Sequence, residues 1–145
     1  MHPYPHLYTA SAAARPEGGV AVTSPGLPGI TTAPPAEFDG PGDVWSPETL
    51  LCASIADCFI LTFRAIARAS SFEWIGLDCR VEGVLDRADG VVQFTRYTTH
   101  ARLEIPQAGD VAKARTLLER SEHRCLVNSS LKGTRTLAAE VVRAA

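Results

Sequence analysis

The pattern of apolar positions predicts one long helix over residues 46–69. Ser46, Pro47 and Glu48 form a typical helix start, because serine caps free backbone N–H groups, proline suits the first helical position and an acid opposes the positive end of the helix dipole. The apolar side chains that follow are spread around most of the circumference and comprise Leu50, Leu51, Ile55, Cys58, Phe59, Ile60, Leu61, Phe63 and Ile66. A helix that is apolar all round is buried on more than one side, so we expect sheet or a second subunit to enclose it.

The part of the chain before this helix alternates short β-type runs with turn residues. The runs lie at residues 6–13, 20–23 and 30–33, and the residues between them are rich in proline and glycine, which favour turns. We therefore expect three short strands, followed by a looser loop over residues 34–44.

The part after the helix begins with a predicted β-hairpin. Two β-type segments, 75–85 and 91–105, flank an Asp89-Gly90 step, a dipeptide that favours the tight turn between two antiparallel strands. Pro106 ends the second segment, since proline has no N–H group to give to a sheet.

The remaining residues predict two helices and a closing strand. Apolar positions repeat with a helical period over 110–125, a short helical turn follows at 128–133, and residues 136–142 alternate as in a strand. The predicted order is βββ-α-ββ-αα-β, an α+β fold. At 145 residues the chain is long enough to bury a core without metal or disulfide support, so we expect a single domain. Its parts are the N-terminal strands and loop (1–45), the central helix (46–69), the hairpin (75–105) and the C-terminal helices and strand (110–142).

The composition argues against some classes of partner. The net charge is −2 and there are only two lysines, so the chain lacks the positive charge with which proteins bind nucleic acids or anionic membranes. The N-terminal residues lack the basic start and apolar stretch of a signal peptide, and no uninterrupted apolar run reaches about 18 residues. We therefore expect a cytoplasmic protein that binds neither nucleic acid nor membrane.

The four cysteines carry the candidate chemistry, because cytoplasmic thiols stay reduced unless they are catalytic, redox-sensing or metal-binding. Cys52 and Cys58 lie about 9 Å apart along the predicted helix and about 120° apart around it, so they cannot form a disulfide with each other. The cysteines and histidines lack zinc-ligand spacing, and no metal site is expected. Cys52 and Cys79 are expected to be small core residues, whereas Cys58 and Cys125 are either inert core residues or reactive ones.

Four segments of the chain carry motifs of a known family. They are Ser-Pro-Glu-Thr-Leu-Leu-Cys-Ala-Ser-Ile-Ala-Asp-Cys-Phe (46–59), Phe-Thr-Arg-Tyr (94–97), Leu-Glu-Ile-Pro (103–106) and Cys-Leu-Val-Asn-Ser-Ser-Leu-Lys-Gly (125–133). In this order they resemble the two cysteine motifs and the intervening strand of the OsmC/Ohr family, the osmotically inducible and organic-hydroperoxide-resistance proteins. The resemblance covers about residues 45–142. It implies an OsmC-like fold in which an antiparallel sheet wraps a buried central helix, and an intertwined two-fold dimer.

The resemblance also implies a thiol-dependent peroxidase that needs no metal, flavin or haem. Cys58 would attack an organic hydroperoxide and become a sulfenic acid, and Cys125 would resolve it as a Cys58–Cys125 disulfide. A dithiol of the lipoyl or thioredoxin type would then reduce the disulfide. An apolar lining from Leu51, Ile55 and Phe59 suits alkyl or fatty-acid hydroperoxides. The C-terminal end of its helix disfavours an anion, so we expect the Cys125 thiol to stay protonated until the sulfenic acid forms.

The resemblance assigns a further role to Glu48, the glutamate of the Pro-Glu motif. In the family this glutamate holds an arginine that activates the attacking cysteine. Glu48 precedes Cys58 by roughly 15 Å along the helix, so it cannot contact the Cys58 of its own chain. It would have to come from a second subunit whose central helix runs antiparallel, which predicts a two-fold dimer. The alternative is that Glu48 only favours the N-terminal end of its helix.

Arg15 is the residue nearest to the position of the family's catalytic arginine. It is the only arginine before residue 64 and lies in an Arg-Pro-Glu-Gly-Gly turn. A shift of a few residues would put a glycine there instead, in which case Arg64, Arg68 or Arg96 would substitute or Cys58 would be a poor nucleophile. Two other functions stay open: a non-catalytic redox-sensing or small-ligand-binding protein, and a Cys-His acyl-transfer enzyme, for which no local histidine is evident.

Overall fold

The computed structural model describes residues 2–145, and the backbone forms two compact units, one ending at Leu50 and the other comprising Leu51–Ala145. The elements follow the order βββ-α-ββ-αα-β that the sequence predicts. One 3₁₀ helix, η1 (Ala36–Phe38), is added within the segment expected to be loop. That the whole chain acts as a single domain stays a prediction.

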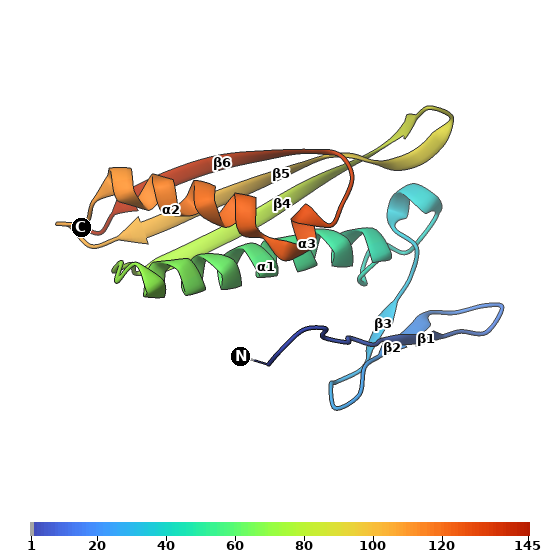
Figure 1. Ribbon diagram of the computed structural model, residues 1–145. Coiled ribbons are helices and arrows are strands. Elements are labelled where there is room, and N and C mark those ends of the chain that lie inside the picture. Colours follow the sequence, from blue (N-terminus) through green and yellow to red (C-terminus); the bar gives the residue numbers. More distant parts are fainter. Residues whose placement is uncertain (1) are drawn as a thin grey trace. The chain divides into compact units, whose positions relative to one another are not determined.

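The first unit contains a three-stranded antiparallel sheet in the order β1-β2-β3 (Figure 1). Its strands are β1 (Ser11–Ala13), β2 (Val20–Thr23) and β3 (Ile30–Thr32). The first strand is shorter than the predicted range 6–13. The reason is that β2, its partner strand, ends at Thr23 where a turn begins, so the earlier residues have no strand to pair with.

The second unit contains a mixed three-stranded sheet in the order β4-β5-β6. A two-residue turn at Asp89 and Gly90, both with positive φ, joins β4 (Gly76–Ala88) to β5 (Val91–Ile105) as an antiparallel hairpin. The strand β6 (Thr134–Arg143) pairs with β5 in parallel. The expectation of an antiparallel sheet is therefore wrong for this strand, because the helices between β5 and β6 carry the chain back to the end where β5 begins.

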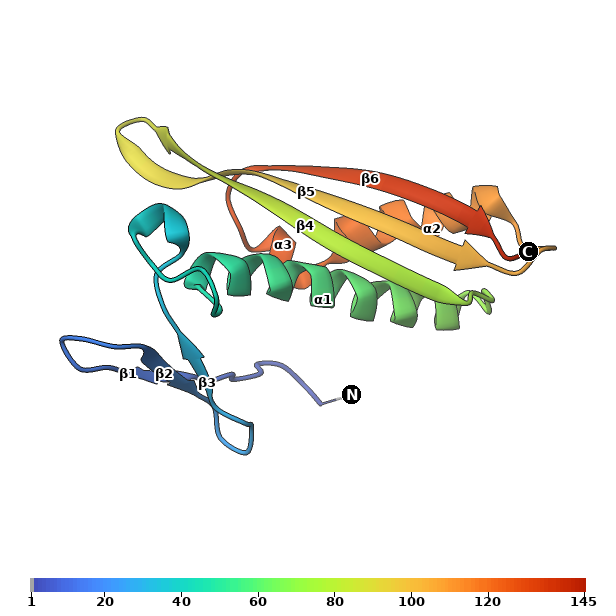
Figure 2. The ribbon, with the colours of Figure 1, turned by 180° about the vertical axis from the view of Figure 1, so that it is seen from behind.

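The helices cover one face of this second sheet, as the two opposite views show (Figures 1 and 2). They are α1 (Pro47–Ala69), of which all but the first turn belongs to this unit, α2 (Val111–Arg124) and α3 (Leu126–Ser129). The core between α1, α2 and β5 comprises Phe59, Phe63, Ile66, Ala67, Ala101, Leu103, Ile105, Ala114, Leu117 and Leu118.

The short helix and the last strand differ from their predicted bounds of 128–133 and 136–142. The helix α3 begins directly after Cys125, whose carbonyl oxygen accepts a hydrogen bond from the Ser129 N–H group. The strand β6 begins earlier because it pairs with β5 from Thr134 onwards. The local apolar pattern specifies neither boundary. The start of α3 depends on a backbone hydrogen bond, and the start of β6 depends on pairing with a distant strand.

The helix α1 buries one stripe of its surface, at Ile55, Phe59, Phe63, Ile66 and Ala67. Other apolar positions on it are half-buried or exposed, and Leu61 is 50% exposed. Among the described residues α1 is the one helix long and apolar enough to span a membrane by length and composition, a test that core helices also pass. The composition of α1 predicts burial on more than one side. This single chain buries one side of the helix and leaves part of its other apolar surface exposed.

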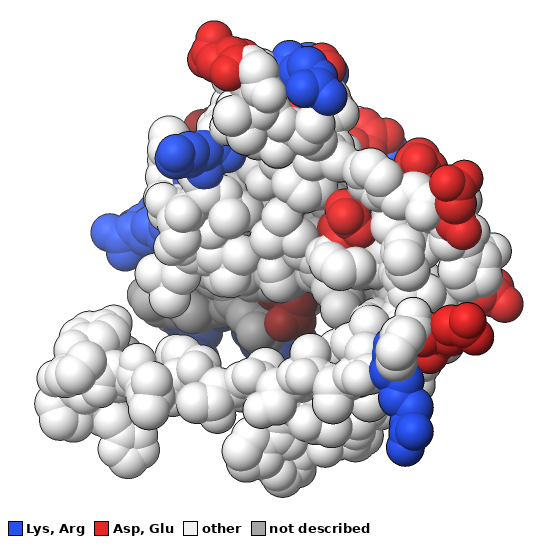
Figure 3. Space-filling model, turned by 90° about the vertical axis from the view of Figure 1, so that its right-hand side faces the viewer, with Lys and Arg blue, Asp and Glu red and all other residues white. Residues whose placement is uncertain are grey.

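One face of the molecule shows no large patch of a single charge. On the face shown in Figure 3, acidic and basic side chains both occur and much of the area carries neither. This agrees with the small net charge of −2.

Candidate functional site

Cys125 lies at the break between α2 and α3. Its extended backbone (φ −62°, ψ 108°) ends the first helix and starts the second. The side chain is completely buried, and the thiol Sγ donates to the carbonyl oxygen of Ile55 on α1 at 3.9 Å. The change of direction between the two helices thus places the thiol against α1.

Cys58 lies three residues after Ile55 on α1, on the same side of the helix. It is half-buried, with its Sγ atom 4.0 Å from the Thr62 hydroxyl. Burial raises the pKa of Cys125 to about 11. The Asn128 backbone N–H opposes this rise, and the nearby Cys58 side chain adds to it. The structure therefore brings Cys58 and Cys125 close together. A protonated Cys125 thiol agrees with the expectation, although the main cause of its raised pKa is burial and not the end of the helix.

Cys52 and Cys79 are also half-buried in the second unit, and all four thiols are free. Burial raises the pKa of Cys79 to about 12, and the nearby Cys125 and Glu122 raise it further. Burial also raises the pKa of Cys52, and a backbone hydrogen bond from Gly83 opposes it. Thiols that stay protonated at neutral pH are weak nucleophiles, which agrees with the expected packing role.

Glu48 lies in the first turn of α1. The cap of that helix is formed without it, because the Thr49 N–H donates to the Ser46 hydroxyl at 3.1 Å and the Ser46 N–H donates to the Thr49 hydroxyl at 2.9 Å. One carboxylate oxygen of Glu48, Oε2, is buried and has no hydrogen-bonding partner among residues 2–145. Glu48 and Cys58 lie two to three turns apart on the same helix, as the sequence requires.

Arg15 lies in the turn between β1 and β2 and is exposed to solvent. It belongs to the first unit, whereas Cys58 and Cys125 belong to the second. That Arg15 and Glu48 act on Cys58 therefore stays a prediction.

Sequence reasoning missed a buried carboxylate, Glu122, in the last turn of α2. Its Oε1 atom accepts a hydrogen bond of 2.8 Å from the Asn128 side-chain amide, while its Oε2 atom has no partner in the described part of the chain. Burial raises the pKa of Glu122, and Arg135, the Asn128 amide, the Thr99 hydroxyl and His123 oppose the rise. The signal was available, because Glu122 is four residues after Leu118 and so falls on the apolar face of the helix.

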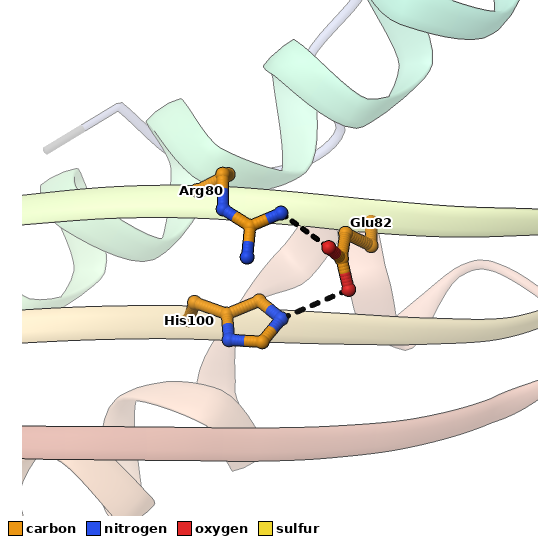
Figure 4. Close-up of polar contacts among 3 residues, drawn as sticks. All are labelled: Arg80, Glu82 and His100. Atoms are coloured by element: carbon orange, nitrogen blue, oxygen red, sulfur yellow. Dashed lines mark hydrogen bonds and ion pairs between the residues drawn. The ribbon is translucent and has the colours of Figure 1, made fainter.

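A second polar cluster lies on the sheet face that the helices leave uncovered. Figure 4 shows the Glu82 carboxylate on β4 between Arg80 on the same strand and His100 on β5. The Arg80 hydrogen bond, and then that of His100 at 3.0 Å, lower the pKa of Glu82. These exposed groups therefore form hydrogen bonds and ion pairs with one another. Within residues 2–145 no three His, Cys, Asp or Glu side chains are placed to hold a metal ion.

Two neighbouring cysteines, one on a long core helix and one at a helix break, on an α+β scaffold, are the features of an OsmC-like protein. The OsmC-like protein family model matches residues 40–140, so the chain belongs to this family. The expected family and fold class are both confirmed.

Three relatives illustrate the similarity. The uncharacterized protein YmaD of Bacillus subtilis is 28% identical over 109 residues, which cover 73% of each chain. An OsmC-like protein of unknown function from Vibrio cholerae has a TM-score of 0.83 at 11% identity, with 95% of this chain and 100% of that chain covered. An organic hydroperoxide resistance protein from Legionella pneumophila has a TM-score of 0.75 at 22% identity, with 96% and 98% covered. The Legionella protein, which is also named OsmC, is thus a protein of this fold that is named for hydroperoxide resistance.

Proposed function

We propose that this protein is a cysteine peroxidase that reduces organic hydroperoxides. The observation that carries the proposal is the proximity of Cys58 and Cys125. The Cys125 thiol donates to the Ile55 carbonyl on α1, three residues before Cys58, and the nearby Cys58 side chain raises the pKa of Cys125. Two thiols that face one another can pass from dithiol to disulfide without a metal or an organic cofactor. The name of the Legionella relative indicates the class of oxidant.

In the first step the Cys58 thiolate attacks the terminal oxygen of the hydroperoxide. The O–O bond breaks, the terminal OH stays on sulfur as a sulfenic acid, and the alkoxide takes a proton and leaves as an alcohol. In the second step the Cys125 sulfur attacks the Cys58 sulfur and the S–O bond breaks. One water leaves, and a Cys58–Cys125 disulfide remains. A dithiol of the lipoyl or thioredoxin type then restores both thiols.

Apolar side chains around Cys58 favour an alkyl or fatty-acid hydroperoxide over hydrogen peroxide. Ile55 and Phe59, its neighbours on α1, are fully buried, and Leu51 is half-buried. An alkyl chain gains free energy from burial against such side chains, whereas hydrogen peroxide has no apolar part to bury. We expect catalysis in the cytoplasm, with no nucleic-acid or membrane partner.

Activation of Cys58 is proposed to involve a second subunit. The side of α1 that includes the half-exposed Leu61 offers an apolar surface to a second chain. One carboxylate oxygen of Glu48 has no hydrogen-bonding partner among the described residues of this chain. In an antiparallel pair of α1 helices, Glu48 of each chain would hold Arg15 beside Cys58 of the other. The arginine would stabilise the thiolate by its charge.

The peroxidase proposal is tested by stopped-flow measurement of the reduced protein. Cumene hydroperoxide or a fatty-acid hydroperoxide should react much faster than hydrogen peroxide and consume two thiols per chain. Cys58→Ser should abolish the reaction, Cys125→Ser should leave a sulfenic acid that dimedone traps, and Cys52→Ser and Cys79→Ser serve as matched controls. Equal and slow rates for all peroxides would refute the proposal and favour a redox sensor.

The role of the second subunit is tested by mixing two inactive variants. Chains carrying Cys58→Ser and chains carrying Glu48→Gln are unfolded together and refolded. Random pairing should recover roughly a quarter of the wild-type sites, since half of the dimers are mixed and each mixed dimer has one complete site. No recovery, with both variants dimeric, would show that Glu48 serves its own chain only.

A further inference from the structure

Thr62 is the polar side chain that contacts Cys58 on α1. The two residues are four positions apart, which places them one above the other on the same side of the helix. The Sγ atom of Cys58 lies 4.0 Å from the Oγ1 atom of Thr62, and both side chains are half-buried. The steps of the proposed peroxidase reaction do not involve Thr62, so the contact has no role in them.

The hydroxyl group of Thr62 is not used by the backbone of its helix. A serine or threonine inside a helix commonly donates its hydroxyl proton to the carbonyl oxygen three or four residues before it. Within residues 2–145 the Thr62 hydroxyl makes no such bond, and its recorded contact is with the Cys58 sulfur. Other helical hydroxyls do donate to a carbonyl: Ser54 to Leu51 at 2.8 Å, Thr116 to Ala112 at 3.1 Å and Ser121 to Leu117 at 2.7 Å. The Thr62 proton is therefore available to the sulfur.

The other positions next to Cys58 on α1 provide no such donor. One turn before Cys58 lie Ser54 and Ile55, and one turn after it lie Leu61 and Thr62. The Ser54 side chain is exposed, and its proton is already donated to a backbone carbonyl. Ile55 and Leu61 are apolar. Thr62 is thus the side chain by which α1 can donate a hydrogen bond to Cys58.

The titratable group near Cys58 from another element is Cys125, at the break between α2 and α3. Its pKa of about 11 keeps this thiol neutral at pH 7. A thiol is a weak donor, and the recorded hydrogen bond of Cys125 goes to the Ile55 carbonyl at 3.9 Å. On α1 itself, the charged residues nearest in sequence are Asp57 and Arg64, and both are exposed. The recorded contact of Cys58 with a stronger donor is therefore the one with Thr62.

We propose that the Thr62 hydroxyl donates a hydrogen bond to the Cys58 thiolate and so increases the share of Cys58 that can attack a hydroperoxide. This inference rests on the proposed peroxidase function and adds a residue to its site. Hydrogen bonds to charged acceptors are shorter and about twice as strong as those between neutral groups, so the 4.0 Å contact should shorten when the thiol is ionised. Thr62 keeps its own proton throughout. When sulfur bonds to the terminal oxygen, the negative charge passes to the departing alkoxide.

This hydrogen bond has two opposite effects on the rate. At the low end of what a hydrogen bond to a charged group contributes, the thiolate is favoured roughly tenfold. A stabilised thiolate is also a weaker nucleophile, by about threefold for this change, because nucleophilicity follows basicity with a slope of about 0.4–0.5. Thr62 should therefore accelerate attack about threefold where Cys58 is mostly protonated and slow it about threefold where Cys58 is fully ionised.

The test measures the alkylation of Cys58 by iodoacetamide over a wide range of pH, with mass spectrometry of the peptide that contains Cys58. Thr62→Val keeps the shape of the side chain and removes the hydroxyl. Its pH profile should have a midpoint about one pH unit higher, a rate about threefold lower below the midpoint and a plateau about threefold higher at alkaline pH. Thr62→Ser keeps the hydroxyl and should restore the wild-type profile. Thr116→Val is the matched control, because the Thr116 hydroxyl is bonded to the Ala112 carbonyl on α2, and its profile should not change.

The crossing of the two profiles separates hydrogen bonding from a structural role. A change in packing alone would alter the rate by the same factor at every pH and would leave the midpoint in place. An unchanged midpoint in Thr62→Val, or the same profile in Thr62→Ser as in Thr62→Val, would overturn the inference. If Thr62→Val does not fold, Thr62→Ala also lacks the hydroxyl and is held to the same outcomes.

The same variants in stopped-flow reaction with cumene hydroperoxide connect the inference to the proposed function. The two profiles should cross as they do with iodoacetamide. If the wild-type protein does not react with hydroperoxides but Thr62→Val shifts the alkylation profile, the peroxidase proposal fails and the role of Thr62 stands. If hydroperoxides are reduced and the midpoint does not depend on Thr62, the peroxidase proposal stands and the role of Thr62 fails.

Discussion

Replacing Glu122 by glutamine should stabilise the folded protein at neutral pH. The residue is 8% exposed, and its Oε2 atom has no partner in the described chain. A buried polar atom without a partner costs about 1–3 kcal/mol, and a charged one more. Glutamine keeps an oxygen that accepts from Asn128 and removes the charge. Because the attraction to Arg135 is lost at the same time, we expect a net gain of about 1 kcal/mol at pH 7.

This gain should depend on pH in one direction. Burial raises the pKa of Glu122 above its ordinary value of 4.5, so the folded protein holds this proton more tightly than the unfolded chain. The stability that this bound proton contributes to the folded protein is fully present below pH 4.5. It is lost as the pH rises through the raised pKa of Glu122. Glu122→Gln has no such titration, so its advantage over the wild type should grow from acidic to neutral pH.

Urea denaturation at several pH values measures this difference in the free energy of unfolding. Glu119→Gln is the matched control, since Glu119 is exposed and its replacement should have almost no effect. The reasoning is refuted if Glu122→Gln is less stable than the wild type at neutral pH, or if the difference between the two proteins does not change with pH.

Three further predictions concern the core and the start of α1. Phe63→Ala should destabilise the protein by about 3–5 kcal/mol, because Phe63 is fully buried. Leu61 is two residues away and half-exposed, so Leu61→Ala should cost under about 1 kcal/mol in a monomer. Thermal unfolding compares the two variants. Gly83→Ala should cost about 1–3 kcal/mol, since a Cβ atom would lie 2.9 Å from Cε1 of Phe94 and 3.0 Å from the Cys52 sulfur. Cys52→Ala in the same chain should recover part of this cost in urea denaturation. Ser46→Ala should cost about 0.5–2 kcal/mol through loss of the cap, and Ser46→Asp should restore most of it by the same assay.

The sequence predicted those parts of the fold that depend on local signals. The helix expected over 46–69 is observed as Pro47–Ala69, because serine, proline and the apolar run act within one segment. The hairpin is observed with its two-residue turn at Asp89 and Gly90, whose positive φ angles suit these residue types. The order of elements follows from the same kind of evidence.

The parts that the sequence did not predict depend on contacts between distant residues. Alternation over 136–142 indicates a strand but does not say which strand it pairs with, and the parallel pairing with β5 follows from the path of α2 and α3. The position of Cys125 at the C-terminal end of a helix was predicted, but its approach to the Ile55 carbonyl was not. Glu122 was missed because its charge suggests a surface residue, although its spacing places it among buried ones.

The helix break at Cys125 determines how strongly this thiol competes with thiols in solution. Its backbone is held on both sides, since it ends α2 and its carbonyl oxygen accepts from the Ser129 N–H at 2.9 Å in α3. The side chain therefore has little conformational freedom left to lose when it bonds to Cys58. An anchored thiol acts at an effective concentration far above that of any dissolved thiol, so a small free thiol would capture an intermediate at Cys58 only when Cys125 is removed.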